Sequence, residues 1–143
     1  MTRKTIFITG GAKRIGAVTA KYFHERDYNI VLHYNKSEGE AHRLTEELNK
    51  LRENSCFKIK ADFSSEESIS SMIDEFHELS CGLNILINNA SSFYPTPVGE
   101  ISEDDWVSLI GSNVKGPLFL SQALAPALAV SKGCIINMVD MHI

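Results

Sequence analysis

The chain has 143 residues, of which 43% are hydrophobic, so length and composition predict one globular domain, residues 1–143, with a hydrophobic core. A formal net charge of −4 argues against a nucleic-acid partner and against attraction to an anionic membrane. The apolar run before Gly10 is too short for a signal peptide or a membrane span, and the three cysteines are far apart, so we expect a cytoplasmic protein with reduced thiols, no membrane segment and no metal site.

Short apolar runs alternate with segments of helical periodicity along the whole chain. Strands are expected at residues 6–8, 29–34, 56–61, 83–87 and 134–139, the last of them fully buried. Helices are expected at residues 14–26, 37–51, 64–76 and 102–129, with the pairs Ser37/Glu40, Ser64/Glu67 and Ser102/Asp105 at their starts and a kink at Gly116-Pro117. Because parallel strands require crossover helices, this order predicts an α/β fold, a doubly wound parallel sheet of Rossmann type with five strands.

Residues 6–17 have the order expected for a buried strand, a tight turn and the start of a helix. Gly10 would let the chain turn, and Gly16 would let the helix pack closely on the strand. Backbone N–H groups and the positive end of the helix dipole would then point at one spot, where Lys13 and Arg14 add two positive charges. The segment predicts a phosphate site, although a plain strand-to-helix connection could contain the same glycines.

Polar residues gather at the expected carboxyl ends of the strands, where doubly wound folds bind ligands. Residues 32–37 contain no acid that could hold the ribose hydroxyls of NAD, which favours a 2′-phosphate, and hence NADPH, over a merely solvated basic loop. Asp62 could accept a hydrogen bond from an adenine amine or begin a turn. Asn88-Asn89 could contact a ligand or form a turn, and Asn113, in a mostly apolar helical stretch, is structural or catalytic.

Together these motifs resemble the short-chain dehydrogenase/reductase family. The segment from Thr9 to Gly16 is similar to its Thr-Gly-x-x-x-Gly-x-Gly turn, with Arg14 in place of the middle glycine. Residues 88–91 are similar to its Asn-Asn-Ala-Gly motif, with Ser91 in place of the glycine. Both departures resemble the pteridine reductase branch, as do residues 11–16, 32–34, 88–97 and 136–140.

The resemblance implies an NADPH-dependent oxidoreductase that transfers hydride to a pterin or dihydropteridine and forms a homo-oligomer when complete. The implied cofactor-binding residues are Gly10, Lys13, Arg14, Ile15, Gly16, His33, Tyr34, Asn35, Ser37, Asp62, Phe63, Asn89, Ala90 and Ser91, with Lys13, Arg14 and His33 facing the 2′-phosphate. The implied substrate-binding residues are Arg14, Ser91 and Phe93, the last stacked on the bicyclic ring. The implied catalytic residues are Asn113, which would help to build a water relay, and Asp140, which would support proton delivery. Alternatively, Phe93 is a loop aromatic that covers the core and Asp140 is a turn residue at the end of a strand.

The family's acid–base pair, Tyr-x-x-x-Lys, is absent from the sequence, because none of the four tyrosines has a lysine four residues later. In the family this pair lies on the helix after the fifth strand. We therefore expect that the chain lacks the C-terminal part of the family fold and is inactive by itself. A reductase for another carbonyl or imine substrate, or a non-catalytic nucleotide-binding or interaction fragment, are the alternative interpretations.

Overall fold

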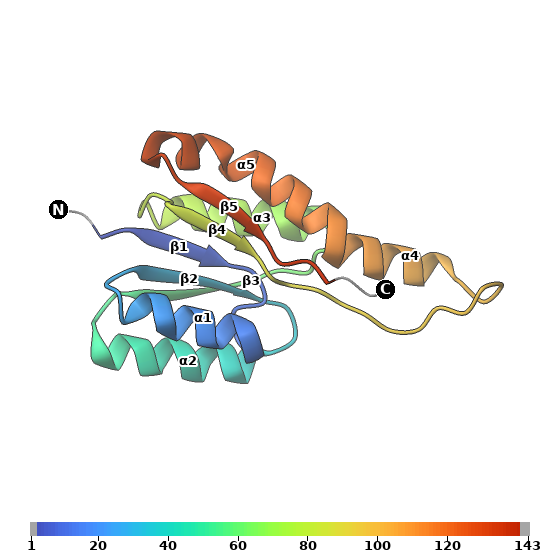
Figure 1. Cartoon of the computed structure of the whole chain (residues 1–143), viewed down its shortest axis with the longest axis horizontal. Coiled ribbons are helices and arrows are strands. Elements are labelled where there is room, and N and C mark those ends of the chain that lie inside the picture. Colours follow the sequence, from blue (N-terminus) through green and yellow to red (C-terminus); the bar gives the residue numbers. More distant parts are fainter. Residues whose placement is uncertain (1–2, 141–143) are drawn as a thin grey trace.

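The computed structural model describes residues 3–140, which form a five-stranded parallel sheet with helices on both faces (Figure 1). The strands are β1 (Thr5–Ile8), β2 (Asn29–Tyr34), β3 (Cys56–Lys60), β4 (Ile85–Asn88) and β5 (Cys134–Asn137). The helical elements are α1 (Arg14–His24), α2 (Glu38–Leu51), α3 (Glu66–Glu78), α4 (Glu103–Ile110), the π-helical turn η1 (Gly111–Lys115) and α5 (Gly116–Ser131). The strand order is β3-β2-β1-β4-β5, which confirms the expected doubly wound sheet.

Strands β1, β2 and β4 are largely buried because helices cover both faces of the sheet there (Figure 1). Successive side chains of β1 point to opposite faces: Ile6 and Ile8 pack in the cluster shared with α1 and α2, whereas Phe7 packs in the cluster shared with α3 and α5. Phe7 stacks on Phe76 of α3 with ring centroids 5.2 Å apart. Two hydrophobic layers therefore hold the central strand.

Helix α1 faces the sheet through its small residues. Gly16 and Ala20 are buried, whereas Ile15 and Val18, which the periodicity places on the apolar face, are 61% and 68% exposed. The reason is the short turn after β1, which brings the helix axis too close to the strand for bulky side chains to fit between them.

The start of α4 has the expected capping box, because Ser102 accepts a hydrogen bond from the backbone of Asp105 and the Asp105 carboxylate accepts one from the backbone of Ser102. The other two capping predictions are wrong. Ser37 precedes α2 but its side chain makes no capping hydrogen bond, and α3 is capped by Ser65 because Ser64 bonds to Asp62 instead.

Helices α4 and α5 continue through η1, where one wider turn replaces the expected kink at Gly116-Pro117. Pro117 lies directly after η1, in the first turn of α5. Asn113 lies inside η1, and a π-helical turn of this kind is common at functional sites.

Strand β5 forms an edge of the sheet among the described residues, paired only with β4. All four of its residues are exposed. The apolar sequence of β5 is typical of a fully buried strand, but among the described residues no further strand covers its outer edge. Both Ile135 and Ile136 are 39% exposed although they point to opposite faces, because neither face of β5 is fully covered by the described helices.

Candidate functional site

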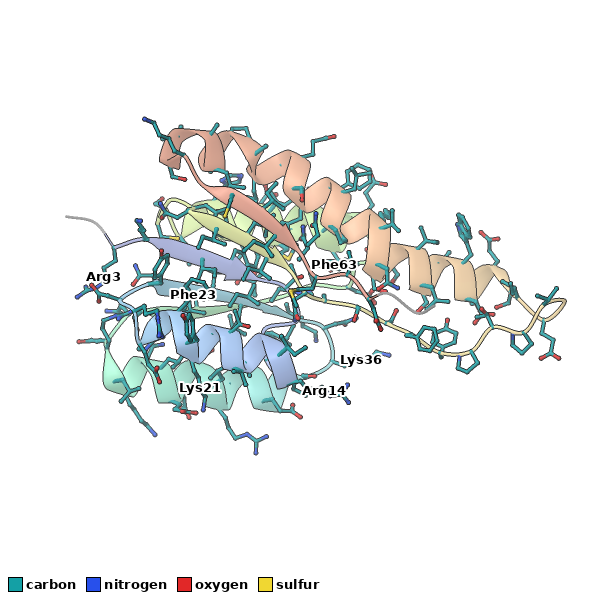
Figure 2. All side chains as sticks on the ribbon, viewed as in Figure 1. Arg3, Arg14, Lys21, Phe23, Lys36 and Phe63 are labelled. Atoms are coloured by element: carbon teal, nitrogen blue, oxygen red, sulfur yellow. The ribbon has the colours of Figure 1, made fainter. Side chains whose placement is uncertain are left out.

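A cavity of about 780 Å³ opens at the carboxyl end of the sheet, beside the point where the strand order reverses between β1 and β4. Every residue predicted to bind the cofactor lines it: Gly10, Lys13, Arg14, Ile15, Gly16, His33, Tyr34, Asn35, Ser37, Asp62, Phe63, Asn89, Ala90 and Ser91. Figure 2 shows Arg14 and Lys36, which also lines the cavity, at the same end of the sheet, opposite the end that carries Arg3.

The turn after β1, Gly10–Gly16, has no room for side chains at its glycines. Gly10 has φ +60°, and a Cβ there would lie 2.9 Å from the Cα of Ala90. A Cβ on Gly16 would lie 2.2 Å from the carbonyl oxygen of Gly10. The predicted roles of both glycines, turning the chain and letting helix and strand approach, are therefore confirmed.

The segment after β4 holds this glycine turn from the other side. Asn89 donates through Nδ2 to the carbonyl oxygens of Thr9 at 3.0 Å and Gly10 at 3.2 Å. Thr9 Oγ1 in turn accepts from the backbone N–H groups of Asn89 and Ala90, both at 2.9 Å. The side chain of Asn89 thus connects the segment after β4 to the glycine turn, which a simple turn residue would not do. Ala90 is held against Gly10 by the same set of hydrogen bonds.

His33 fixes the same turn from β2, and the prediction that it faces a 2′-phosphate is wrong. Its Nδ1 accepts from the backbone N–H of Gly10 at 3.1 Å, so Nε2 carries the proton and donates to the carbonyl oxygen of Ala61 at 3.0 Å. The ring stacks on Phe63 with centroids 4.4 Å apart and is 3% exposed. Burial lowers the pKa of His33 to about 4, so the ring is neutral at pH 7. Its two hydrogen bonds connect the end of β2 to the segments that follow β1 and β3.

This burial predicts an acid-dependent loss of stability. Because the folded pKa of His33 is about 4 and the unfolded value is 6.5, the unfolded state binds the extra proton as pH falls, so stability present above pH 6.5 is lost between pH 6.5 and 4. The free energy of unfolding of the wild type should therefore fall between pH 7 and pH 4.5. In a His33→Gln variant, urea unfolding should show a fall that is smaller by about 2–3 kcal/mol. Parallel pH dependences for the two proteins would contradict this assignment.

Three basic side chains line the cavity, which also contains the carboxyl groups of Asp62 and Asp104. The basic side chains are Lys13, Arg14 and Lys36, and the first turn of α1 contains no acidic residue. Cations at a helix N-terminus oppose the helix dipole, so this arrangement stabilises the helix only when an anion binds there. Arg14 also has φ +49°, a left-handed conformation that costs an arginine about 1–2 kcal/mol and a glycine almost nothing.

Asp62 lies at the end of β3, where Ser64 donates to Oδ1 through both its hydroxyl at 2.7 Å and its backbone N–H at 2.9 Å. These hydrogen bonds lower the pKa of Asp62, so the carboxylate is ionised at neutral pH. It both begins the turn before α3 and presents an acceptor to the cavity, so its two predicted roles are compatible.

With this geometry established, comparison with known proteins assigns the chain. Residues 4–142 match the family model described as short chain dehydrogenase. The chain belongs to the short-chain dehydrogenase family. The region matched contains all five strands and the complete cavity lining, so the family assignment covers the whole site.

The individual relatives that match this chain are about 30% identical to it. Pteridine reductase 1 of Leishmania tarentolae is 32% identical over 97% of this chain and 61% of that protein. Two uncharacterised oxidoreductases of Staphylococcus aureus, from strains USA300 and N315, are 29% and 28% identical over 99% of this chain and 60% of their own length. The chain therefore spans about 60% of the length of these curated relatives.

Three predicted residues of this short-chain dehydrogenase site are not part of the cavity lining. Phe93 is 80% exposed on the long connection between β4 and α4, which Figure 1 shows extending away from the sheet. Asp140 is exposed beyond the end of β5. Asn113 is exposed too, but it is anchored: its Nδ2 donates to the carbonyl oxygen of Ser92 at 2.8 Å, and its Oδ1 accepts from the Ser92 N–H.

Sequence analysis missed one wall of the cavity, which comes from α4 and η1. Asp104, Val107, Ser108 and Ser112 line it, together with Ser92, whose hydroxyl lies 2.5 Å from that of Ser112. The detectable feature was the polar series Asp104, Ser108 and Ser112, whose spacing of four residues places them on one side of a helix. In this short-chain dehydrogenase the wall therefore belongs to the same helical stretch that presents Asn113 to the loop.

Within residues 3–140 the structure shows neither a cluster of side chains able to hold a metal ion nor a helix long and apolar enough to cross a membrane. The donor groups suit an elongated anion instead. The tight glycine turn, the uncapped start of α1 and three cations suit a dinucleotide phosphate, and the cavity volume of about 780 Å³ is within the range of small-molecule sites.

Proposed function

We propose that residues 1–143 are the NADP-binding domain of an oxidoreductase that uses NADPH to reduce a pterin or dihydropteridine. The observation that carries the proposal is the cavity, where a glycine turn, a helix N-terminus and three cations converge. The 32% identity with a protein named pteridine reductase 1 supports the substrate class. The reductant supplies the hydride; this chain supplies its binding, orientation and charge environment.

In the proposed complex the turn Gly10–Gly16 and the start of α1 bind the pyrophosphate. Arg14, Lys13 and Lys36 bind the 2′-phosphate, and Asp62 accepts from the adenine amine. Asn89 keeps the turn in place from β4 through its bonds to Thr9 and Gly10. The position of these groups around one cavity supports each assignment.

Arg14→Ala is expected to weaken NADPH binding by about 1.5–3 kcal/mol, because a charge-assisted contact to the 2′-phosphate is lost. NADH binding should change much less. Fluorescence titration with both nucleotides measures this, and Arg43→Ala, an arginine on α2 outside the cavity lining, is the control. Equal losses for NADH and NADPH would show that Arg14 does not contact the 2′-phosphate, and equal wild-type affinities would refute the NADPH preference.

On the substrate side, we propose that Phe93 stacks on the bicyclic ring and that Arg14 and Ser91 contact both the substrate and the cofactor phosphates. Asn113 would hold one end of a water relay, supported by its two hydrogen bonds to the Ser92 backbone, and Asp140 would assist proton delivery. The test is NADPH oxidation by the complete protein with dihydropteridines. Activity with other carbonyls or imines but not with dihydropteridines would favour the alternative reductase and leave the cofactor proposal standing.

We also propose a cytoplasmic homo-oligomer for the complete protein. Helix α5 has apolar residues on its outer side as well as its inner one, with Leu118 59% and Phe119 41% exposed, and such a helix is usually covered. The three cysteines are free thiols, in agreement with a reducing compartment. Light scattering of the complete protein measures the oligomeric state.

A further inference from the structure

The side chain of Lys13 is paired with a carboxylate from another helix. Lys13 is the N-cap residue of α1, and its Nζ lies 3.6 Å from Oε1 of Glu40 in the first turn of α2. The two helices lie next to each other on one face of the sheet (Figure 1). Both side chains are partly exposed, 52% for Lys13 and 38% for Glu40, so either can move into solvent without leaving a buried charge.

Glu40 lies beside the corner of the cavity proposed to bind the 2′-phosphate. Lys13 and Ser37, the residue before α2, both line the cavity. Glu40, in the first turn of α2, is not part of the lining. Residues 32–37 contain no acid, and the nearest carboxylate to Lys13 comes from the following helix instead. A cation expected to bind the phosphate is thus already in contact with a carboxylate.

We propose that Glu40 is a specificity-determining residue, the counter-ion that Lys13 must leave when a 2′-phosphate binds, and that it limits the preference for NADPH over NADH. This inference rests on the proposed cofactor function. A hydrogen bond from its own backbone N–H, followed by Lys13, lowers the pKa of Glu40, so the carboxylate is ionised at neutral pH. It therefore both competes for Lys13 and repels the incoming phosphate, and both effects weaken binding of a 2′-phosphorylated nucleotide.

A matched control pair lies on the same two helices. Lys21 of α1 contacts Glu47 of α2 with Nζ 2.6 Å from Oε1, at similar exposures of 46% and 51%. Neither residue lines the cavity. Removing the Glu47 charge therefore changes net charge and a helix–helix ion pair as removal at Glu40 does, but at a site remote from the proposed phosphate.

The experiment is isothermal titration calorimetry, which measures the affinity of the chain for adenosine 2′,5′-bisphosphate and for 5′-AMP. These two ligands differ in the 2′-phosphate alone. Because exposed ion pairs contribute little, Glu40→Gln should tighten bisphosphate binding about 2- to 5-fold, and Glu40→Lys should tighten it about 10-fold. Neither variant should change 5′-AMP binding, Glu47→Gln should change neither ligand, and the gain should shrink in high salt. In a Lys13→Met background the gain from Glu40→Gln should fall, because no cation remains to be released.

Several outcomes would overturn the inference. Unchanged bisphosphate affinity in both Glu40 variants would show that the carboxylate does not compete. An equal gain from Glu47→Gln would assign the effect to net charge, and an equal gain for 5′-AMP would separate Glu40 from the 2′-phosphate. If the wild type does not prefer the bisphosphate to 5′-AMP, both the cofactor proposal and the inference are wrong. If the wild type prefers the bisphosphate, and Arg14→Ala abolishes this preference while Glu40→Gln does not change it, only the inference is wrong.

Discussion

Gly16→Ala is expected to destabilise the chain by at least about 3 kcal/mol and to abolish nucleotide binding. The new methyl carbon would lie 2.2 Å from the carbonyl oxygen of Gly10 and 2.9 Å from the Cα of Gly11. Both are backbone atoms held by the hydrogen bonds of His33 and Asn89, so the helix must move away from the strand. Urea unfolding and fluorescence titration with NADPH measure the two effects.

Gly39→Ala is the control for that substitution. Gly39 lies in the first turn of α2, and a Cβ there would meet nothing within 4 Å. Alanine should stabilise the chain by about 0.5–1 kcal/mol, because it restricts the unfolded chain and favours the helix. If Gly16→Ala were as stable as Gly39→Ala and still bound NADPH, the close approach of α1 to β1 would not be required.

The second large effect concerns turnover. We expect residues 1–143 to oxidise NADPH with a dihydropteridine at least ~10²-fold more slowly than the complete protein, because a positioned acid contributes ~10²–10⁴-fold when hydride transfer must be accompanied by a proton. The sequence contains no Tyr-x-x-x-Lys pair, and Asp140 is an exposed carboxylate beyond β5. NADPH absorbance at matched nucleotide saturation measures the difference.

The comparison needs both proteins in a folded state. NADPH titration of residues 1–143 shows whether the cavity is intact, so a loss of turnover with retained binding isolates the missing acid. Equal turnover numbers for the short and the complete chain would show that residues 1–143 contain the whole catalytic apparatus. That result would contradict the expectation that a Tyr-x-x-x-Lys pair outside this chain is needed for turnover.

The arrangement of strands and helices could be predicted from the sequence because each strand is a continuous apolar run and each crossover has helical periodicity. The doubly wound parallel sheet followed from this alternation, and part of the cavity lining followed from polar residues at the expected strand ends. Gly10 and Gly16 were predictable because their spacing matches a turn in which only a residue without a side chain fits.

The errors share a physical cause, which is that side-chain direction depends on tertiary packing. His33 was expected to contribute charge, but in β2 its ring points between β1 and β3, where burial keeps it neutral. Ile15 and Val18 were placed on the buried face of α1 because periodicity cannot show how closely a helix approaches a sheet. The pairing of Lys13 with Glu40 joins two helices and has no local signal in either.

The tie between Asn89 and the glycine turn also has a consequence for the time course of folding during synthesis. Thr9 and Gly10 bond to a side chain about 80 positions further along the chain. Strand β1 likewise pairs with β2, about 24 positions away, before β4 exists to cover its other edge. Contacts of such long sequence separation form late, because the intervening loop must close first. While only β1 to β3 have emerged from the ribosome, the sheet is therefore half built and the glycine turn lacks its bonds to Asn89. The cavity is complete only after Asp104 to Ser112 of α4 and η1 have emerged as well.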